Sequence, residues 1–138
     1  MASEDRAEYV DAIVQVRYAE TDQMGFAYYA NYFVWFEVGR TNFCRARGFT
    51  YADLERKTET FIPVVEARCH YKRSVCYDDE LLVRTRVKEF HRLMLTFSYE
   101  LLDRRTGTLR AVGETRHVFT GSDGRPKSIP SEYRTYFE

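Results

Sequence analysis

The sequence contains few of the residues that are typical of disordered, fibrous or disulfide-bonded chains. Of its 138 residues, 7 are glycine, 3 are proline and 3 are cysteine, whereas 44% are hydrophobic. This composition excludes collagen-like, low-complexity and intrinsically disordered proteins. Three cysteines without CxxC spacing indicate neither a disulfide framework nor a zinc site, so a reducing compartment is expected.

Long apolar runs and an excess of one charge are also absent. No stretch approaches the roughly 18 apolar residues of a membrane-spanning helix, and no apolar segment follows the polar start to act as a signal peptide. Lys plus Arg and Asp plus Glu both number 21, which disfavours a nucleic-acid or membrane-surface binder. We therefore expect a cytoplasmic protein of one domain, residues 1–138, that binds neither nucleic acid nor membranes.

The first half of the chain contains the strongest helical pattern. Apolar residues recur at helical spacing from Tyr32 to Ala46, and Gly48 fits the C-terminal stop of a helix over residues 32–47. Asn31 is a suitable N-cap. The apolar surface is wider than one stripe, so we expect other elements to surround this helix.

Strand-like alternation precedes and follows the helix. We predict a strand over residues 12–18, and after residue 60 the period changes from 3.6 to 2. This change indicates four further antiparallel strands, near residues 65–71, 83–87, 93–101 and 109–119. Short helical segments are expected at residues 50–57 and 131–137. The sequence thus favours an α+β fold, in which a curled five-stranded antiparallel sheet wraps around one long helix.

Most catalytic and metal-binding motifs are missing. The sequence has no HExxH, GxSxG, GxxxxGK[ST] or GxGxxG pattern. His70, His91 and His117 lie in or beside predicted strands and are best interpreted as packed or solvated side chains. Cys44 lies within the long helix among arginines, which could lower the pKa of its thiol, but packing is the simpler interpretation. No metal site is expected.

The loop before the long helix is the exception. It places Asp22 a few residues ahead of a buried helix, whose unpaired N–H groups and positive dipole end can bind an anion or oxyanion. A carboxylate beside oxyanion donors is a minimal apparatus for acyl transfer. On spacing alone, an ordinary turn residue is the commoner interpretation of Asp22.

A longer pattern surrounds this carboxylate. Residues 17–32 are Arg17-Tyr18-Ala19-Glu20-Thr21-Asp22-Gln23-Met24-Gly25-Phe26-Ala27-Tyr28-Tyr29-Ala30-Asn31-Tyr32. The stretch resembles the signature of the 4-hydroxybenzoyl-CoA thioesterase family of hot-dog-fold acyl-CoA thioesterases. That signature is an Asp, a Gly three residues later, an aromatic residue or His seven residues later, and an Asn-aromatic pair, met here by Asp22, Gly25, Tyr29 and Asn31-Tyr32. The likeness extends through residues 77–79, 88–92 and 129–133.

The resemblance implies a hot-dog fold and the hydrolysis of an acyl-CoA to a carboxylic acid and free CoA, with no cofactor. Asp22 would act as nucleophile or general base, and the backbone N–H of Tyr29 would polarise the thioester carbonyl. Gly25 belongs to the same catalytic signature. Tyr29 stands where members that act on short aliphatic thioesters carry His, and so resembles the aromatic-thioester branch.

Contacts with the substrate are also implied. The resemblance matches His91 and Arg92 to a basic cluster that holds the CoA phosphates, while a third basic position of that cluster is Leu93 here. The full set of expected substrate-binding residues is Tyr28, Asn31, His91, Arg92, Arg73 and Lys127.

Assembly and two alternative functions follow from the same pattern. A five-stranded sheet around one helix leaves an exposed edge, so we expect a homo-oligomer, a dimer or more specifically a homotetramer; the resemblance implies an active site at the dimer interface. A thioesterase for acyl groups on an acidic carrier protein is one alternative, because the second half of the chain is basic. A non-catalytic acyl-thioester binding protein is the other, although both Asp22 and Gly25 are present.

Overall fold

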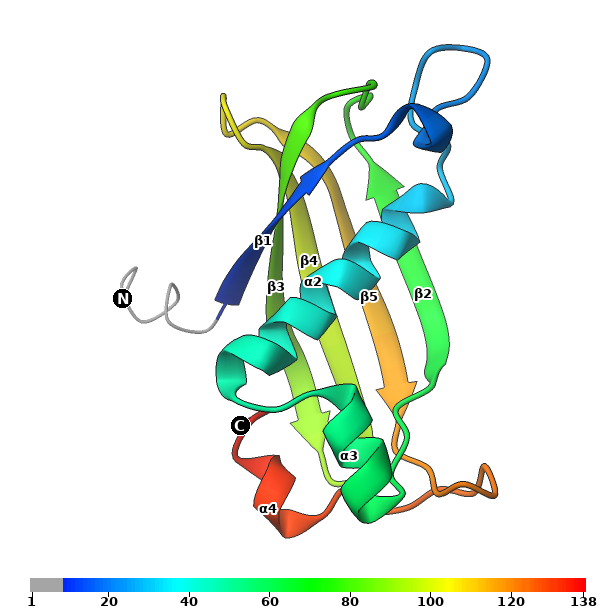
Figure 1. The fold of residues 1–138 in the computed structure, drawn as a ribbon, viewed down its shortest axis with the longest axis vertical. Coiled ribbons are helices and arrows are strands. Elements are labelled where there is room, and N and C mark those ends of the chain that lie inside the picture. Colours follow the sequence, from blue (N-terminus) through cyan, green and yellow to red (C-terminus); the bar gives the residue numbers. More distant parts are fainter. Residues whose placement is uncertain (1–8) are drawn as a thin grey trace.

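The computed structural model describes residues 9–138, which form one sheet and one long helix with smaller elements at the ends (Figure 1). In chain order the elements are β1 (Tyr9–Gln15), the 3-10 helix η1 (Tyr18–Glu20), α2 (Asn31–Arg47), α3 (Tyr51–Thr58), β2 (Val64–Tyr71), β3 (Glu80–His91), β4 (Met94–Asp103), β5 (Leu109–Val118) and α4 (Ser131–Arg134).

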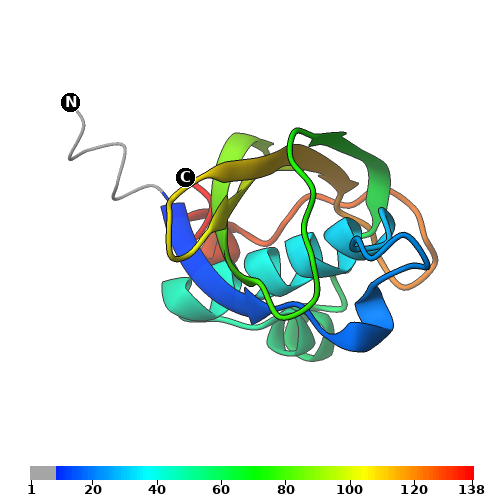
Figure 2. The same ribbon diagram turned by 90° about the horizontal axis from the view of Figure 1, so that it is seen from above.

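The five strands form a single antiparallel sheet in the order β1-β3-β4-β5-β2. The sheet curls around α2, as the view from above shows (Figure 2). Both the fold class and the number of strands predicted from the sequence are confirmed. The strand order leaves β1 and β2 as the two edges, so that each has backbone N–H and C=O groups without a strand partner among residues 9–138.

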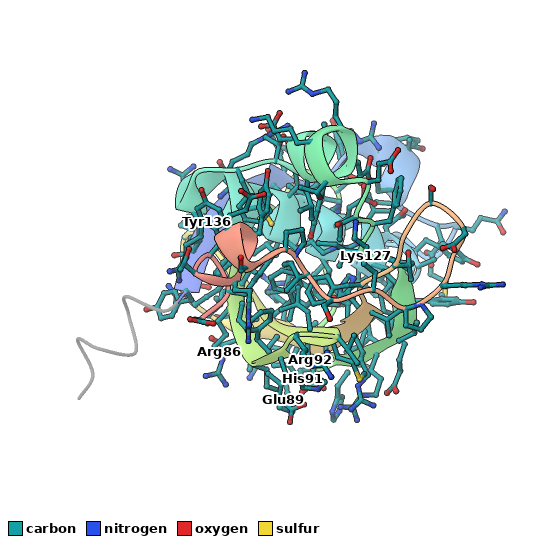
Figure 3. The ribbon with its side chains drawn as sticks, turned by 90° about the horizontal axis from the view of Figure 1, so that it is seen from below. Arg86, Glu89, His91, Arg92, Lys127 and Tyr136 are labelled. Atoms are coloured by element: carbon teal, nitrogen blue, oxygen red, sulfur yellow. The ribbon has the colours of Figure 1, made fainter. Side chains whose placement is uncertain are left out.

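The two ends of the sheet carry different elements. The loop before α2 lies at the end where β2 finishes and β3 begins (Figure 1). The opposite end carries α3, α4 and the tight turn between β3 and β4, together with the labelled side chains of His91, Arg92 and Lys127 (Figure 3).

The predicted boundaries of β1 are wrong. The strand begins three residues earlier than residue 12 and ends at Gln15, which pairs with Glu80, the first residue of β3. Val16 still exchanges backbone hydrogen bonds with Asp79 and Asp78, both at 2.9 Å, and the chain then turns into η1. Tyr18, the last residue of the predicted strand, lies in η1 and is exposed.

The long helix is confirmed, although its N-cap is displaced by one residue. Ala30 is the N-cap and Asn31 is the first helical residue, and the Asn31 side-chain amide donates to the Glu20 carbonyl at 2.8 Å. Gly48 ends the helix in the left-handed region at φ 107°. Ala46 is exposed, contrary to prediction.

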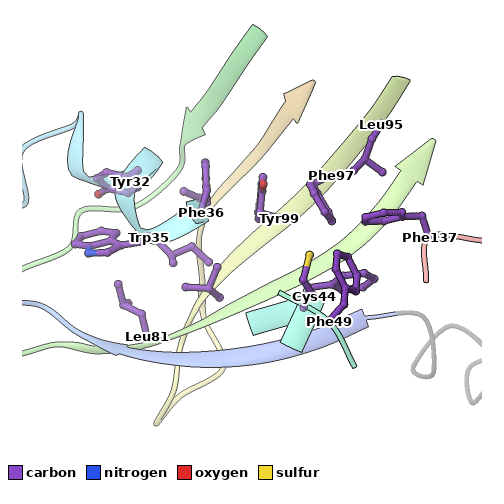
Figure 4. Packing of buried hydrophobic residues seen from close by; sticks show 14 of the residues in the cluster. Tyr32, Trp35, Phe36, Cys44, Phe49, Leu81, Leu95, Phe97, Tyr99 and Phe137 are labelled. Atoms are coloured by element: carbon purple, nitrogen blue, oxygen red, sulfur yellow. The ribbon is translucent and has the colours of Figure 1, made fainter. Parts of the chain in front are cut away.

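The core lies between α2 and the concave face of the sheet (Figure 4). The side chains of Trp35, Phe36 and Phe43 are buried on the helix, and those of Phe97 and Tyr99 are buried on β4. The Phe36 and Tyr99 rings stack with centroids 4.4 Å apart. Burial of these aromatic rings is the main apolar contribution to stability, since each removes a large area from water.

Two glycines allow this close packing. A Cβ atom at Gly39 of α2 would lie 2.5 Å from Thr85 Oγ1, and one at Gly113 of β5 would lie 2.4 Å from the Phe36 ring. Side-chain carbons do not approach other atoms so closely, so α2 can rest on the sheet only if both positions lack a side chain.

His117 and Cys44 are buried in the interior of the fold. His117 Nε2 is 2.8 Å from Thr115 Oγ1, its Nδ1 is 3.2 Å from the Ile62 carbonyl, and burial lowers the pKa of His117 to about 4. Cys44 is fully buried, and burial raises the pKa of its thiol to about 12. Arg40 lowers this pKa, but the loss of hydration outweighs it, so the expectation that arginines could leave Cys44 with a lowered pKa is wrong. The interpretation of His117 and Cys44 as packed side chains is confirmed, and His70 and His91 are exposed.

Candidate active site

The loop of residues 21–30 folds back on itself between η1 and α2. The Asp22 N–H donates to the Phe26 carbonyl at 2.8 Å, and Thr21 and Ala27 form an antiparallel bridge. Gly25 adopts φ 88° and its N–H donates to the Asp22 carbonyl at 3.0 Å. This left-handed conformation favours glycine, so Gly25 shapes the loop through its backbone.

The carboxylate of Asp22 is held by one oxygen only. Its Oδ1 accepts the Met24 N–H at 2.9 Å and the Phe26 N–H at 3.4 Å. Within residues 9–138 its Oδ2 has no hydrogen-bond or ion-pair partner, and the side chain is partly exposed. One oxygen therefore orients the group, while the other remains available to accept a proton or to attack a carbonyl carbon.

Free N–H groups lie at the start of α2. The Tyr28 N–H donates to the Glu20 carbonyl at 2.8 Å, and the Asn31 N–H donates to the Tyr28 carbonyl at 3.0 Å. The intervening N–H groups of Tyr29 and Ala30 have no acceptor in the part of the chain that the structure describes. Unpaired N–H groups at the positive end of a helix can stabilise a developing oxyanion.

The peptide after Tyr29 is fixed from the sheet. The Tyr71 hydroxyl, at the end of β2, donates to the Tyr29 carbonyl at 3.0 Å, and burial raises the pKa of Tyr71 to about 12. The Ala27 N–H donates to the Val75 carbonyl at 2.7 Å, so the chain after β2 runs beside the loop. Sequence patterns missed Tyr71, because it is 42 residues from Tyr29 and no local spacing relates the two.

Exposed aromatic and apolar side chains surround this loop. They are Tyr18, Met24, Phe26, Tyr28, Tyr29, Tyr71 and Tyr77. Their rings contact one another in pairs: Tyr18 with Tyr77 at 5.7 Å, and Tyr29 with both Tyr28 and Tyr71. Such a surface can pack against an apolar or aromatic group of a ligand.

The expected substrate-binding residues are not all at this loop. His91, Arg92 and Lys127 lie at the opposite end of the sheet (Figure 3). The strand β3 alone has 12 residues and spans roughly 35–40 Å. The structure therefore does not bring these three residues to Asp22 within one chain.

Two of these basic residues have contacts within the chain. The Lys127 ammonium donates to the Thr58 carbonyl in the last turn of α3, and Arg92 Nη1 donates to Ser128 Oγ at 3.2 Å. Arg73 lies at the Asp22 end, in the segment between β2 and Val75, and is exposed. Of the four basic candidates, Arg73 is thus the one beside the loop.

Metal-binding clusters and membrane-spanning helices are both absent from residues 9–138. No group of three His, Cys, Asp or Glu side chains among residues 9–138 is placed to hold a metal ion. No helix in the same residues has both the length and the apolar character to cross a bilayer.

One long helix wrapped by a curled antiparallel sheet is the hot-dog fold. Residues 16–136 match the thioesterase-like superfamily. The chain belongs to this superfamily and is a thioester hydrolase, which confirms the resemblance that the sequence carries.

Individual relatives agree with this assignment. The Bacillus subtilis protein YneP is 37% identical over 105 residues, which are 76% of this chain and 75% of that protein. The acyl-CoA thioesterase YbgC of Haemophilus influenzae is 28% identical and 90% of each chain is covered. A DHNA-CoA thioesterase from Staphylococcus aureus has a TM-score of 0.86 and 32% identity over 93% of this chain and 85% of that one.

Proposed function

We propose that the protein hydrolyses an acyl-CoA to a carboxylic acid and free CoA, with Asp22 as the catalytic carboxylate and the Tyr29 N–H as oxyanion donor. The observation that carries the proposal is the pairing of a carboxylate that has one free oxygen with free N–H groups at the start of α2. The names of the relatives YbgC and the Staphylococcus aureus enzyme support an acyl-CoA substrate.

The chemistry needs no metal or cofactor in this proposal. A thiol has a pKa of about 8.5, so a thiolate leaves without strong help from a general acid. As general base, Asp22 takes a proton from water while the water oxygen attacks the carbonyl carbon, and the C–S bond then breaks. As nucleophile, Asp22 forms a mixed anhydride as CoA departs, and water hydrolyses it. In both routes the oxyanion lies against the Tyr29 N–H.

Label from oxygen-18 water can enter the Asp22 carboxylate only by the nucleophilic route. Label in the product acid alone fits the general-base route and also water attack on the acyl carbonyl of the anhydride. In a single turnover, the nucleophilic route places one label in the Asp22 carboxylate if water attacks the enzyme-derived carbonyl of the anhydride, and mass spectrometry of the peptide that contains Asp22 detects this label.

A homodimer is the smallest assembly that the proposal requires. All side chains of the edge strand β2 except the half-buried Cys69 are exposed, including those of Val65 and Tyr71. Antiparallel pairing of β2 with β2 of a second copy would cover this edge. It would also bring the His91 and Arg92 end of one copy next to the Asp22 end of the other.

This arrangement accounts for the distance between the basic cluster and the carboxylate. The thioester would lie at the loop of one subunit, while the CoA phosphates would reach guanidinium groups of its partner and Arg73 beside the loop. Sedimentation that gives only a monomer at micromolar concentration would contradict both the dimer and this division of the binding site. A tetramer would be formed by two such dimers.

The exposed tyrosine rings favour an aromatic acyl group over a short aliphatic one. Tyr28 and Tyr29 lie directly before α2, and ring stacking adds about 0.5–1.5 kcal/mol to the burial of an aromatic group. A cytoplasmic location remains our proposal and is consistent with three free cysteines.

The experiment that tests the function is thiol release from a panel of aromatic, short and medium acyl-CoA thioesters, with Asp22→Asn as the control. Activity in the wild type alone supports the proposal. Activity only on acyl groups attached to a carrier protein would show that the substrate is the acylated carrier protein and not acyl-CoA. No activity on either substrate would favour a non-catalytic acyl-thioester binding protein.

A further inference from the structure

Glu20 is a buried carboxylate directly before the Asp22 loop. Its side chain is only 7% exposed, and both oxygens accept hydrogen bonds. The Arg17 N–H donates to Oε1 at 2.8 Å, and the Trp35 indole N–H donates to Oε2 at 3.0 Å. Hydrogen bonds to a carboxylate are among the stronger ones in proteins, particularly when water is excluded.

The main-chain carbonyl of the same residue holds the far end of the loop. It accepts the Tyr28 N–H at 2.8 Å and the Asn31 side-chain amide at 2.8 Å. Tyr28 and Asn31 stand on either side of the two free N–H groups at the start of α2. One residue thus fixes the chain before Asp22 through its side chain and the chain after the loop through its carbonyl.

Trp35 makes this attachment rigid. It lies one turn into α2, is 1% exposed, and its ring contacts the Tyr32 ring at 5.0 Å. Since the core fixes α2 against the sheet, the indole N–H has a fixed position, and its hydrogen bond to Glu20 fixes the residue before the loop. A loop without this attachment would be anchored to α2 only by its own covalent connection and the Asn31 side chain.

We propose that Glu20 is a positioning residue, which holds the Asp22 carboxylate and the Tyr29 N–H in a fixed relation through its bonds to Trp35, Tyr28 and Asn31. This inference rests on the proposed function of Asp22. It assigns Glu20 no contact with substrate. Displacement of a catalytic group by about 1 Å can lower a rate by roughly 100-fold, so such a residue affects the rate constant more than binding.

The substitution Glu20→Gln tests this role with little change in shape. A glutamine presents one carbonyl oxygen and one NH₂ group, so either the Arg17 N–H or the Trp35 N–H must face a donor. We expect kcat to fall at least tenfold and KM to change less than threefold. Glu37→Gln is the matched control, because Glu37 is exposed on α2 and has no ion pair within residues 9–138.

A second substitution makes the test specific to the indole. Trp35→Phe removes the N–H and leaves Glu20 Oε2 without its donor, so kcat should fall again. In the double variant, which carries both Glu20→Gln and Trp35→Phe, the glutamine NH₂ no longer faces an indole N–H. Its kcat should therefore be higher than the product of the two single-variant fold losses predicts. Losses that simply multiply would overturn the direct Glu20–Trp35 coupling.

Unfolding must be separated from misplacement. All variants are assayed well below their unfolding temperatures, with the folded fraction measured by circular dichroism, and hydrogen exchange is followed in residues 21–30. Glu20→Gln should accelerate exchange at Tyr28, and Glu37→Gln should not. The proposal is overturned if exchange is unchanged and kcat stays within twofold of the wild type. It is also overturned if the loss in kcat equals the unfolded fraction.

Failure of the proposed function has a different signature. If the wild type hydrolyses no thioester but Glu20→Gln still accelerates exchange in the loop, Glu20 holds the loop and Asp22 is not a catalytic carboxylate. The wild-type assay and the exchange measurement therefore answer the two questions separately.

Discussion

Replacement of Asp22 by asparagine should abolish most of the catalysis while leaving the loop intact. Asparagine keeps an Oδ1 that can accept the Met24 and Phe26 N–H groups, and its NH₂ replaces an oxygen without a partner in the described chain. The free energy of unfolding should therefore change by no more than about 0.5 kcal/mol. What the substitution removes is the charge and basicity of the free oxygen.

The expected loss in kcat is at least 10²- to 10³-fold, by order of magnitude from single catalytic groups. At about 1.4 kcal/mol per factor of ten, this corresponds to roughly 3–4 kcal/mol of transition-state stabilisation. Because the group acts on the transition state, kcat and kcat/KM should fall by similar factors. Initial rates of thiol release across an acyl-CoA concentration series give both constants.

Asp22→Ala separates the chemistry from the loop. Alanine also removes the acceptor of the Met24 N–H, which should cost about 1 kcal/mol of stability because water replaces only part of that bond. If the carboxylate performs the chemistry, the two variants should lose kcat to similar extents. An asparagine variant that keeps more than half of the wild-type kcat, or one far more active than the alanine variant, would refute the catalytic assignment.

Three further predictions follow from the contacts and charges described above. Tyr71→Phe deletes the hydrogen bond to the Tyr29 carbonyl, worth about 0.5–1.5 kcal/mol, and should lower the kcat of the folded enzyme by up to roughly 2- to 12-fold; an unchanged kcat would contradict this role. Arg92→Ala should raise KM for acyl-CoA roughly tenfold, leave kcat nearly unchanged and weaken the salt dependence of KM, and identical salt slopes would move the phosphate site elsewhere. The pKa of His117 is lowered from 6.5 in the unfolded chain to about 4 in the fold. Between pH 6.5 and 4 the unfolded chain therefore binds a proton that the folded protein does not, and the stability that is fully present above pH 6.5 is lost as the pH falls. Urea unfolding should show a loss of about 3 kcal/mol over this range, and His117→Gln should show a smaller pH dependence.

The elements with strong local patterns could be predicted from the sequence. The helix over residues 32–47 and its stop at Gly48 were predicted to within one residue, because amphipathic spacing and a left-handed C-terminal residue are both properties of adjacent residues. The cap at Thr50, which accepts the Asp53 N–H, belongs to the same kind of signal. Alternation likewise predicted four antiparallel strands after residue 60 and hence the class of fold.

The boundaries of an edge element depended on its partner. The alternating residues continue to Tyr18, yet the strand ends at Gln15. Val16 bonds to Asp78 and Asp79 before β3, and Glu20 then accepts the Arg17 N–H and turns the chain into η1. Asn31 has the side chain of a good N-cap, but the Glu20 carbonyl takes its amide as donor. A hydrogen bond to a group that is distant in the sequence can thus override the local capping preference of a residue.

The catalytic loop shows the same division. Asp22, Gly25 and Tyr29 are seven residues apart at most, so their spacing is visible in the sequence and carried the family resemblance. The residues that hold the loop are Glu20 with Trp35 on α2 and Tyr71 on β2, and only the packing of α2 and β2 against the loop brings them there. The separation of Arg92 from Asp22 also depended on tertiary structure. Both residues lie beside turns, but the strand order puts those turns at opposite ends of the sheet, because each antiparallel strand reverses the direction of the chain.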